Sequence, residues 1–278
     1  MSKPIALTIA GSDSGGGAGI QADIKSMEAN GVFATSALAA VTAQNTETVA
    51  EAHDLPPSLV EAQIDAVAGD MDVRAAKTGM LSDPAIIEVV ADCVRRHDLQ
   101  PLVVDPVMIS KTGFKLLKEE AIDTLLEKLL PLATLITPNV HEASHLTAVD
   151  EIETVEDLQA AAEALYERGP DAVLAKGGHL AGEEEAVDVL VDGSTVRTYA
   201  APRVDTPHTH GTGCTYASAI AANLAKEYEL PSAVDRAKRY VTGAIRHALP
   251  LGHGRGPTNH FFHLNPEAAV NDSPDPSK

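Results

Sequence analysis

Asp205-Thr206-Pro207-His208-Thr209-His210-Gly211-Thr212-Gly213-Cys214-Thr215 leads directly into an apolar segment, YASAIAANLA, at residues 216–225. The glycines and small polar residues indicate a loop, and the apolar run indicates a helix that begins near Cys214. The first N–H groups of a helix lack partners within the helix, and the helix dipole makes this end positive. Because both effects favour phosphate, the sequence predicts a site for a transferring phosphoryl group at Gly211, Thr212, Gly213 and Cys214, with His210 in the same loop.

The two cysteines have different surroundings in the sequence. Cys214 lies near the predicted helix N-terminus, where a thiol pKa is lowered, so we expect the pKa of Cys214 to lie below its usual value. Cys93 lies on the apolar side of the helical pattern at 85–96 and is predicted to be a core residue. Two cysteines and no secretory signal pattern predict a reducing cytoplasm as the compartment.

Short apolar runs alternate with helical patterns along most of the chain. The runs predict strands, and the segments between them have the 3.6-residue period of helices. This alternation is typical of an α/β fold with a mostly parallel sheet covered on both faces. The predicted strands are 5–10, 32–41, 74–77, 102–104, 135–137 and 172–175, with a hairpin at 186–200, and the predicted helices are 20–30, 57–68, 83–96, 118–130, 154–168, 214–226 and 231–249.

No linker interrupts this pattern, so we predict a single domain over residues 1–264. The polar, proline-rich segment 265–278 is predicted to be a disordered tail. The net charge is −19, from 40 acidic and 21 basic residues, which disfavours duplex nucleic acid as a partner. Such acidity is compatible with a high-salt source or with an ordinary acidic enzyme. No apolar run approaches the roughly 18 residues of a membrane span.

Polar residues follow several predicted strands, and the ends of parallel strands meet at one edge of a sheet. Asp105 ends one strand, and Asn139 and Glu142 follow the next. Carboxylate and amide oxygens at such a place suit Mg²⁺ held together with substrate phosphates, although Asp and Asn also begin helices. Lys176, between a strand and Gly177-Gly178, is a candidate phosphate contact or a solvated lysine.

A glycine-rich loop, 11–19, follows the first predicted strand. Gly17-Ala18-Gly19-Ile20-Gln21-Ala22 satisfies GxGxxA, but the loop is long and no acidic residue closes the next strand, which disfavours a dinucleotide site. The alternatives are a flexible surface loop and a backbone that approaches a ligand, with Asp23 pointing into the site. The amide of Gln44 could pair with a heterocycle that carries an amino group beside a ring nitrogen, or it could lie on the surface.

The motifs taken together resemble the hydroxymethylpyrimidine/phosphomethylpyrimidine kinases of thiamine biosynthesis, a family of the ribokinase-like superfamily. The resemblance covers residues 5 to about 262, with the motifs in the same order. They are ALTIAGSDSGGGAGIQAD (6–23), AVTAQNT (40–46), KTGML (77–81), VVDPVM (103–108), LITPNVHEA (135–143), AKGGH (175–179), DTPHTHGTGCTYASAIAA (205–222) and GRGPTNHF (254–261).

The resemblance implies a three-layer α/β/α fold and transfer of phosphoryl groups from ATP with Mg²⁺. The acceptor would be 4-amino-5-hydroxymethyl-2-methylpyrimidine and then its monophosphate, which yields the diphosphate. The resemblance also implies a homodimer. No fused synthase domain is expected, since no residues remain to form one. By the same resemblance, the pyrimidine would contact Gly11, Asp23, Gln44, Met80 and Val107; the nucleotide would contact Asn139, Lys176 and His210; and Asp105 and Glu142 would lie at the metal.

Two further expectations follow from the resemblance. Gly211, Thr212, Gly213 and Cys214 would hold the γ-phosphoryl group in transit, with Cys214 as general base or with the backbone amides alone responsible. Some relatives phosphorylate pyridoxal, and they tend to carry an apolar residue at the position of Gln44, so Gln44 favours the aminopyrimidine. A non-catalytic ligand sensor is the remaining alternative, and a sensor is expected to have lost the anion loop or the acidic residues.

Overall fold

The computed structural model describes residues 3–108, 117–147, 149, 151–178, 180, 185–193 and 195–264. Within these residues the core is a nine-stranded sheet in the order β3-β2-β1-β4-β5-β6-β7-β8-β9. Strands β2, β1, β4, β5, β6 and β7 are parallel, and β3, β8 and β9 are antiparallel to their neighbours. The strands are β1 (Ile5–Asp13), β2 (Phe33–Gln44), β3 (Val49–Asp54), β4 (Val73–Thr78), β5 (Leu102–Val104), β6 (Leu135–Ile136), β7 (Ala172–Lys176), β8 (Glu185–Asp192) and β9 (Thr195–Pro202).

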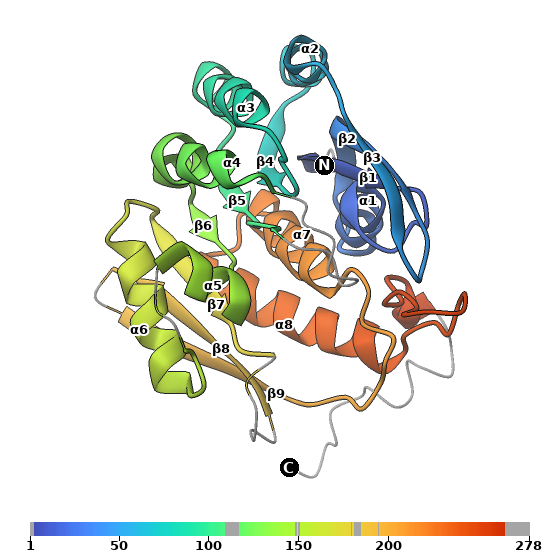
Figure 1. Cartoon of the computed structure of the whole chain (residues 1–278), viewed down its shortest axis with the longest axis vertical. Helices are drawn as coiled ribbons and strands as arrows, with labels where there is room; N and C mark the ends of the chain where they lie inside the picture. Colours follow the sequence, from blue (N-terminus) through green and yellow to red (C-terminus); the bar gives the residue numbers. More distant parts are fainter. Residues whose placement is uncertain are drawn as a thin grey trace.

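Helices cover both faces of the sheet, so the predicted three-layer α/β/α arrangement is confirmed. One face packs on α1 (Gly19–Ala29), α7 (Thr212–Ala225) and α8 (Leu230–Arg246). The other packs on α2 (Pro57–Ala68), α3 (Pro84–His97), α4 (Glu119–Thr124), α5 (Val140–Thr147) and α6 (Val155–Tyr166). Figure 1 shows α7 and α8 side by side, with α2 to α6 around the opposite margin.

The short strand β5 shows why the sequence folds into layers. Successive side chains of a strand point to opposite faces, so an uninterrupted apolar run serves two cores at once. Leu102 and Val104 pack in the core beneath α2 to α6, whereas Val103 packs in the core beneath α1, α7 and α8. All three side chains are fully or almost fully buried.

Most predicted elements are present, and the local capping signals are correct. Asp83 accepts a hydrogen bond from the Ala85 N–H at the start of α3, with Pro84 in the first turn. Thr154 and Asp157 form the predicted capping box of α6. The hairpin around Asp192 and Gly193 forms between β8 and β9.

The structure differs from the sequence predictions in three places. The helix predicted at 118–130 begins as α4 and continues as a π-helix, Leu125–Leu129, and a 3-10 turn, Leu130–Leu132, because Pro131 has no N–H to donate to a regular helical ladder. Strand β3 was not predicted, since most of its residues are exposed and it lacks an apolar pattern. The short helix α5 was not predicted either.

None of the helices in the described part of the chain is both long and apolar enough to cross a membrane. The predicted tail at 265–278 lies outside the described residues.

Candidate active site

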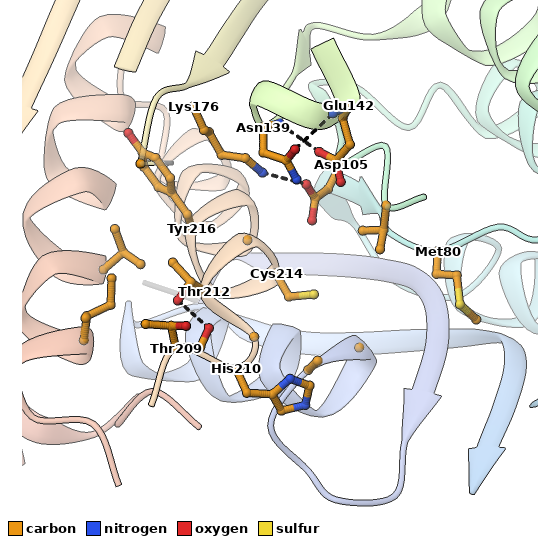
Figure 2. Close-up of a pocket in the computed structure, with 18 of the residues that line it drawn as sticks. Met80, Asp105, Asn139, Glu142, Lys176, Thr209, His210, Thr212, Cys214 and Tyr216 are labelled. Carbon is orange, nitrogen blue, oxygen red and sulfur yellow. Dashed lines mark hydrogen bonds and ion pairs between the residues drawn. The ribbon is translucent and has the colours of Figure 1, made fainter. Parts of the chain in front are cut away.

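The loops that follow the parallel strands line one cavity of about 1250 Å³. It is lined by the end of β1, which extends to Asp13 into the predicted glycine loop, by Ala18 and Gly19, by the ends of β2, β4, β5 and β7, and by the N-terminus of α7. Figure 2 shows the Asp105, Asn139, Glu142 and Lys176 side chains on one side and His210 on another, with Cys214 between them. A cavity of this size can hold two small substrates at once.

The predicted anion loop lies at the centre of the cavity. Gly211 precedes α7 with a φ of 76°, and a Cβ added there would lie 1.7 Å from the Gly17 carbonyl oxygen. Only glycine therefore fits, because the glycine loop packs directly on the anion loop. The Thr212 N–H donates to the Thr209 carbonyl at 3.3 Å, whereas the N–H groups of Gly213 and Cys214 have no partner among the described residues, as an anion site requires.

The C-terminal segment supports this loop from behind. The His210 N–H donates to the Gly256 carbonyl at 3.1 Å, and the Thr258 N–H donates to the His210 carbonyl at 3.3 Å. Inside α7, the Thr215 hydroxyl is 3.0 Å from His260 Nε2. Burial lowers the pKa of His260 to about 4, so this imidazole is neutral and adds no charge beneath the loop.

The expectation of a low pKa for Cys214 is wrong. Burial raises the pKa of the Cys214 thiol to about 12; nearby Lys77 lowers it, but Asp23 and Asp105 raise it further. The lowering of the thiol pKa by the helix N-terminus is outweighed, because the thiolate would lose its hydration and lie near two carboxylates. Cys214 is half-buried and borders the cavity, so it is placed for contact with a ligand but is a neutral thiol in this state.

Asp105 and Lys176 form an ion pair beside the anion loop. Lys176 Nζ is 3.0 Å from Asp105 Oδ1, which also accepts a hydrogen bond from the Thr137 hydroxyl at 3.2 Å. A methyl carbon added at Gly213 would lie 3.5 Å from Lys176 Nζ and 3.7 Å from Asp105 Oδ2. The cation and the carboxylate therefore face the place where the loop would hold an anion.

Asn139 and Glu142 are joined by two reciprocal hydrogen bonds at the start of α5. The Asn139 N–H donates to Glu142 Oε2 at 2.8 Å, and the Glu142 N–H donates to Asn139 Oδ1 at 3.0 Å. This is the geometry of a capping box, with Asn in the role of the hydroxyl residue. Burial raises the pKa of Glu142 to about 7; Lys176 opposes this rise, and Asp105 adds to it.

The same carboxylates suit a divalent cation carried by a nucleotide. Asp105 Oδ2 is buried and has no hydrogen-bond partner in the described structure, so one oxygen is left for a ligand. Mg²⁺ commonly takes one or two carboxylates and fills its remaining positions with water and phosphate oxygens. No cluster of three His, Cys, Asp or Glu side chains suitable for a metal occurs among the described residues.

Gly11, Gln44, Met80 and Val107 also line the cavity, and Figure 2 shows Met80 on the side away from Lys176. Gly11 lies directly against the Met80 side chain. The Gln44 side-chain oxygen accepts a hydrogen bond from the Thr42 hydroxyl at 3.3 Å, and its amide nitrogen is 3.4 Å from His210 Nε2. This end therefore combines one polar amide with apolar walls, as a small heterocycle requires.

His210 lies beside Asp13 and Gln44, and not beside Asn139 and Lys176, with which it was grouped in the sequence prediction. Its Nε2 is 2.9 Å from Asp13 Oδ2, and Asp13 also accepts hydrogen bonds from the Gly15, Gly17 and Ala18 N–H groups. Burial raises the pKa of Asp13, but the bonds from His210 and the backbone outweigh it and hold that pKa below its usual value. The imidazole is thus directed away from Lys176 by a buried carboxylate.

Asp23 does not point into the cavity as predicted. It is fully buried beneath it, where both of its oxygens lie 2.9 Å from Lys77 Nζ. The Thr8 and Ser218 hydroxyls each donate to Asp23 at 2.6 Å. The residue that reaches the cavity lining is Lys77, so Asp23 holds the lysine and not the ligand.

Three residues of the site were missed by sequence reasoning. Lys77 is the second-last residue of β4 and is buried, and a lysine before Thr-Gly at a buried strand end was the available signal. Asp188 and Lys238 line the far end of the cavity and pair at 2.6 Å. They come from β8 and α8, about 50 residues apart, and no local pattern connects them.

Comparison with known proteins agrees with this geometry. The family model described as Phosphomethylpyrimidine kinase matches residues 13–259. The hydroxymethylpyrimidine/phosphomethylpyrimidine kinase of Streptomyces coelicolor is 51% identical over 264 residues, covering 95% of this chain and 97% of the relative.

Solved structures of similar proteins include two vitamin kinases. A Bacillus subtilis pyridoxal kinase, in complex with ADP, has a TM-score of 0.89 and 41% identity, covering 95% of this chain and all of the other. A phosphomethylpyrimidine kinase from Clostridium difficile has a TM-score of 0.78 and 45% identity, covering 87% of this chain and all of the other. The extent of the family match and the identity of the relatives establish that the chain belongs to the hydroxymethylpyrimidine/phosphomethylpyrimidine kinase family.

Proposed function

We propose that this chain phosphorylates 4-amino-5-hydroxymethyl-2-methylpyrimidine with ATP and then phosphorylates the monophosphate to the diphosphate, as a step of thiamine biosynthesis. The observation that carries this proposal is a single cavity with two chemically different ends. One end carries Gln44 and Met80, and the other carries Lys176 and Asp105, with the N-terminus of α7 between them. This is the order that in-line transfer between two bound substrates requires.

Positioning and charge neutralisation carry most of the catalysis. Lys176 and the first-turn N–H groups of α7 face the transferring group and stabilise its negative charge. Asp105, Asn139 and Glu142 would hold a Mg²⁺ ion, which supplies further positive charge at the nucleotide phosphates. Their oxygens stand on the strand ends and the capped helix already described, so little reorganisation is needed during the reaction.

Cys214 is proposed to contact the acceptor hydroxyl. A thiol with a pKa of about 12 is not a ready base, so the amides of residues 211–214 carry the larger share of the chemistry. Replacing Cys214 with Ser and with Ala tests this role, with kcat for the first phosphorylation as the readout. If both variants retain near-full kcat, Cys214 does not take the proton.

The choice of acceptor rests on Gln44. Its amide offers a donor and an acceptor side by side, which complements an amino group next to a ring nitrogen. Pyridoxal is the competing acceptor, because the similar Bacillus subtilis structure is a pyridoxal kinase. A ligand sensor is disfavoured because the anion loop and the acidic residues are all present.

The deciding experiment is a paired assay. Purified protein is incubated with ATP and Mg²⁺ and with either alcohol, and the products are identified by mass over time. We expect the pyrimidine monophosphate first and the diphosphate later. Turnover of pyridoxal far above that of the pyrimidine would overturn the proposed acceptor, and binding of either alcohol without turnover would support a sensor.

Assembly and compartment are also proposals. The family resemblance favours a homodimer, and exposed apolar side chains such as Phe33 and Val41 on β2 are groups that an interface would cover. Light scattering on the purified protein measures the mass directly. Both cysteines are free thiols, which is compatible with the reducing cytoplasm that we propose.

A further inference from the structure

Among the described residues, five lysine and arginine side chains line the cavity, and four of them are engaged by the fold. Lys77, Lys176 and Lys238 are paired with Asp23, Asp105 and Asp188. Arg203 donates to the Gly178 and Leu180 carbonyls at 2.8 and 2.6 Å. The fifth is Arg255, whose guanidinium has no hydrogen bond or ion pair with any residue in the described part of the chain.

The backbone around Arg255 is held firmly, although its side chain is exposed. The Arg255 N–H donates to the Thr46 carbonyl at 3.0 Å. A Cβ at Gly254 would lie 2.1 Å from that same carbonyl oxygen, and one at Gly256 would lie 2.0 Å from the Leu249 carbonyl oxygen. Glycines on both sides thus let the segment pack closely, and the packing fixes the point from which the arginine extends.

This segment belongs to the acceptor end of the cavity. Thr46 lies two residues after Gln44, and the carbonyl of Gly256 accepts the N–H of His210. Figure 1 shows the red segment that follows α8 beside β2 and β3, away from β7 and β8. Arg255 therefore stands between the turn after Gln44 and the anion loop, and not among the nucleotide residues Asn139 and Lys176.

We propose that Arg255 binds the phosphate of the phosphorylated acceptor, which makes it a specificity residue for the second phosphorylation. The inference rests on the proposed function, because only that reaction brings an anionic acceptor into this end of the cavity. A guanidinium suits phosphate because its N–H groups match two phosphate oxygens at once. The alcohol carries no charge and needs no such partner.

The chemistry of the second step explains why a free cation is required. An oxygen of the acceptor phosphate attacks the γ-phosphorus, the new P–O–P bond forms, and the bond from that phosphorus to the bridging oxygen of ATP breaks to release ADP. Two phosphate groups must therefore approach each other in a protein of net charge −19. A cation that is not already neutralised by a carboxylate lowers this repulsion.

The test measures both phosphorylations in the variants Arg255→Ala and Arg255→Lys. The alcohol and its monophosphate are supplied in separate assays. Arg239→Ala is the matched control, since this arginine on α8 is exposed and paired with Asp235. We expect Arg255→Ala to raise KM for the monophosphate by about tenfold to a hundredfold, the range for a hydrogen bond to a charged group. KM and kcat for the alcohol should stay within about twofold, and Lys should restore part of the loss.

Binding of the monophosphate without ATP, measured by calorimetry, separates this inference from the proposed function. A loss of affinity of about tenfold in Arg255→Ala supports the inference even if no turnover of the alcohol is seen. Unchanged affinity for the monophosphate overturns it. Equal losses with both acceptors, or a raised KM for ATP, would also overturn it and would assign Arg255 to the nucleotide phosphates.

Discussion

The buried pair of Lys77 and Asp23 gives a prediction whose size can be worked from the structure. Replacing Lys77 with Met keeps most of the side-chain volume but removes the ammonium group. Both partners are fully buried, and Nζ lies 2.9 Å from each carboxylate oxygen. Burial lowers the pKa of Lys77, but the attraction of Asp23 and Asp105 together with the bond to Asp23 outweighs burial and holds this pKa above its usual value.

Removing one partner of a buried ion pair typically costs ~3–5 kcal/mol, because the remaining charge has no water around it. Here Asp23 keeps the hydroxyl donors of Thr8 and Ser218, so we expect the lower part of that range. The double variant Lys77→Met/Asp23→Leu should recover much of the loss, since replacement of both charges by apolar groups is often nearly neutral.

The measurement is the free energy of unfolding from urea denaturation at pH 7. The exposed pair of Arg239 and Asp235 on α8 is the matched control, and breaking it should cost only ~0.3–0.5 kcal/mol. A loss below ~1 kcal/mol in Lys77→Met would refute the reasoning, because it would mean that the pair is hydrated. An additive loss in the double variant would refute the pairing itself.

Three further predictions concern residues that line the cavity. Gly211→Ala should reduce kcat by at least about tenfold and lower stability, because the methyl group meets the Gly17 carbonyl, whereas Gly31→Ala, at a φ of 82° with open space around it, should cost only ~1 kcal/mol. Asp13→Asn should make the free energy of unfolding depend less on pH. The pKa of Asp13 is lowered on folding, so its ionised form stabilises the fold above the usual carboxylate pKa, and this stabilisation is lost as pH falls through the lowered value. Unfolding measured from pH 7 to pH 3 tests this. If the wild type and Asp13→Asn lose stability in parallel, that assignment is wrong. Gln44→Met should lower kcat/KM for the aminopyrimidine more than for pyridoxal, and an equal effect on both would show that Gln44 does not select the acceptor.

Much of the fold was predictable because its signals are local. Asp83 with Pro84, and Thr154 with Asp157, are within a few residues of the backbone groups that they satisfy. Apolar runs such as Leu102–Val104 predict a strand that is buried on both faces, whichever elements pack against it. Strand β3 escaped prediction because it depends on pairing with β2. Helix α5 was missed although its Asn139–Glu142 bonds are local, because its 8 residues give too short an apolar pattern.

The sequence by itself determined the layered α/β fold and the family, and it predicted an anion loop at the start of α7, because each follows from periodicity, motif order or the unpaired N–H groups of a helix end. Only the tertiary structure decided where the side chains around that loop point and which of them are ionised. Asp23 binds Lys77 from 54 residues away, and Asp13 turns His210 toward Gln44 across 197 residues. The pKa of Cys214 rises for the same reason: desolvation and nearby charges depend on everything that surrounds a group, which the order of residues along the chain does not state.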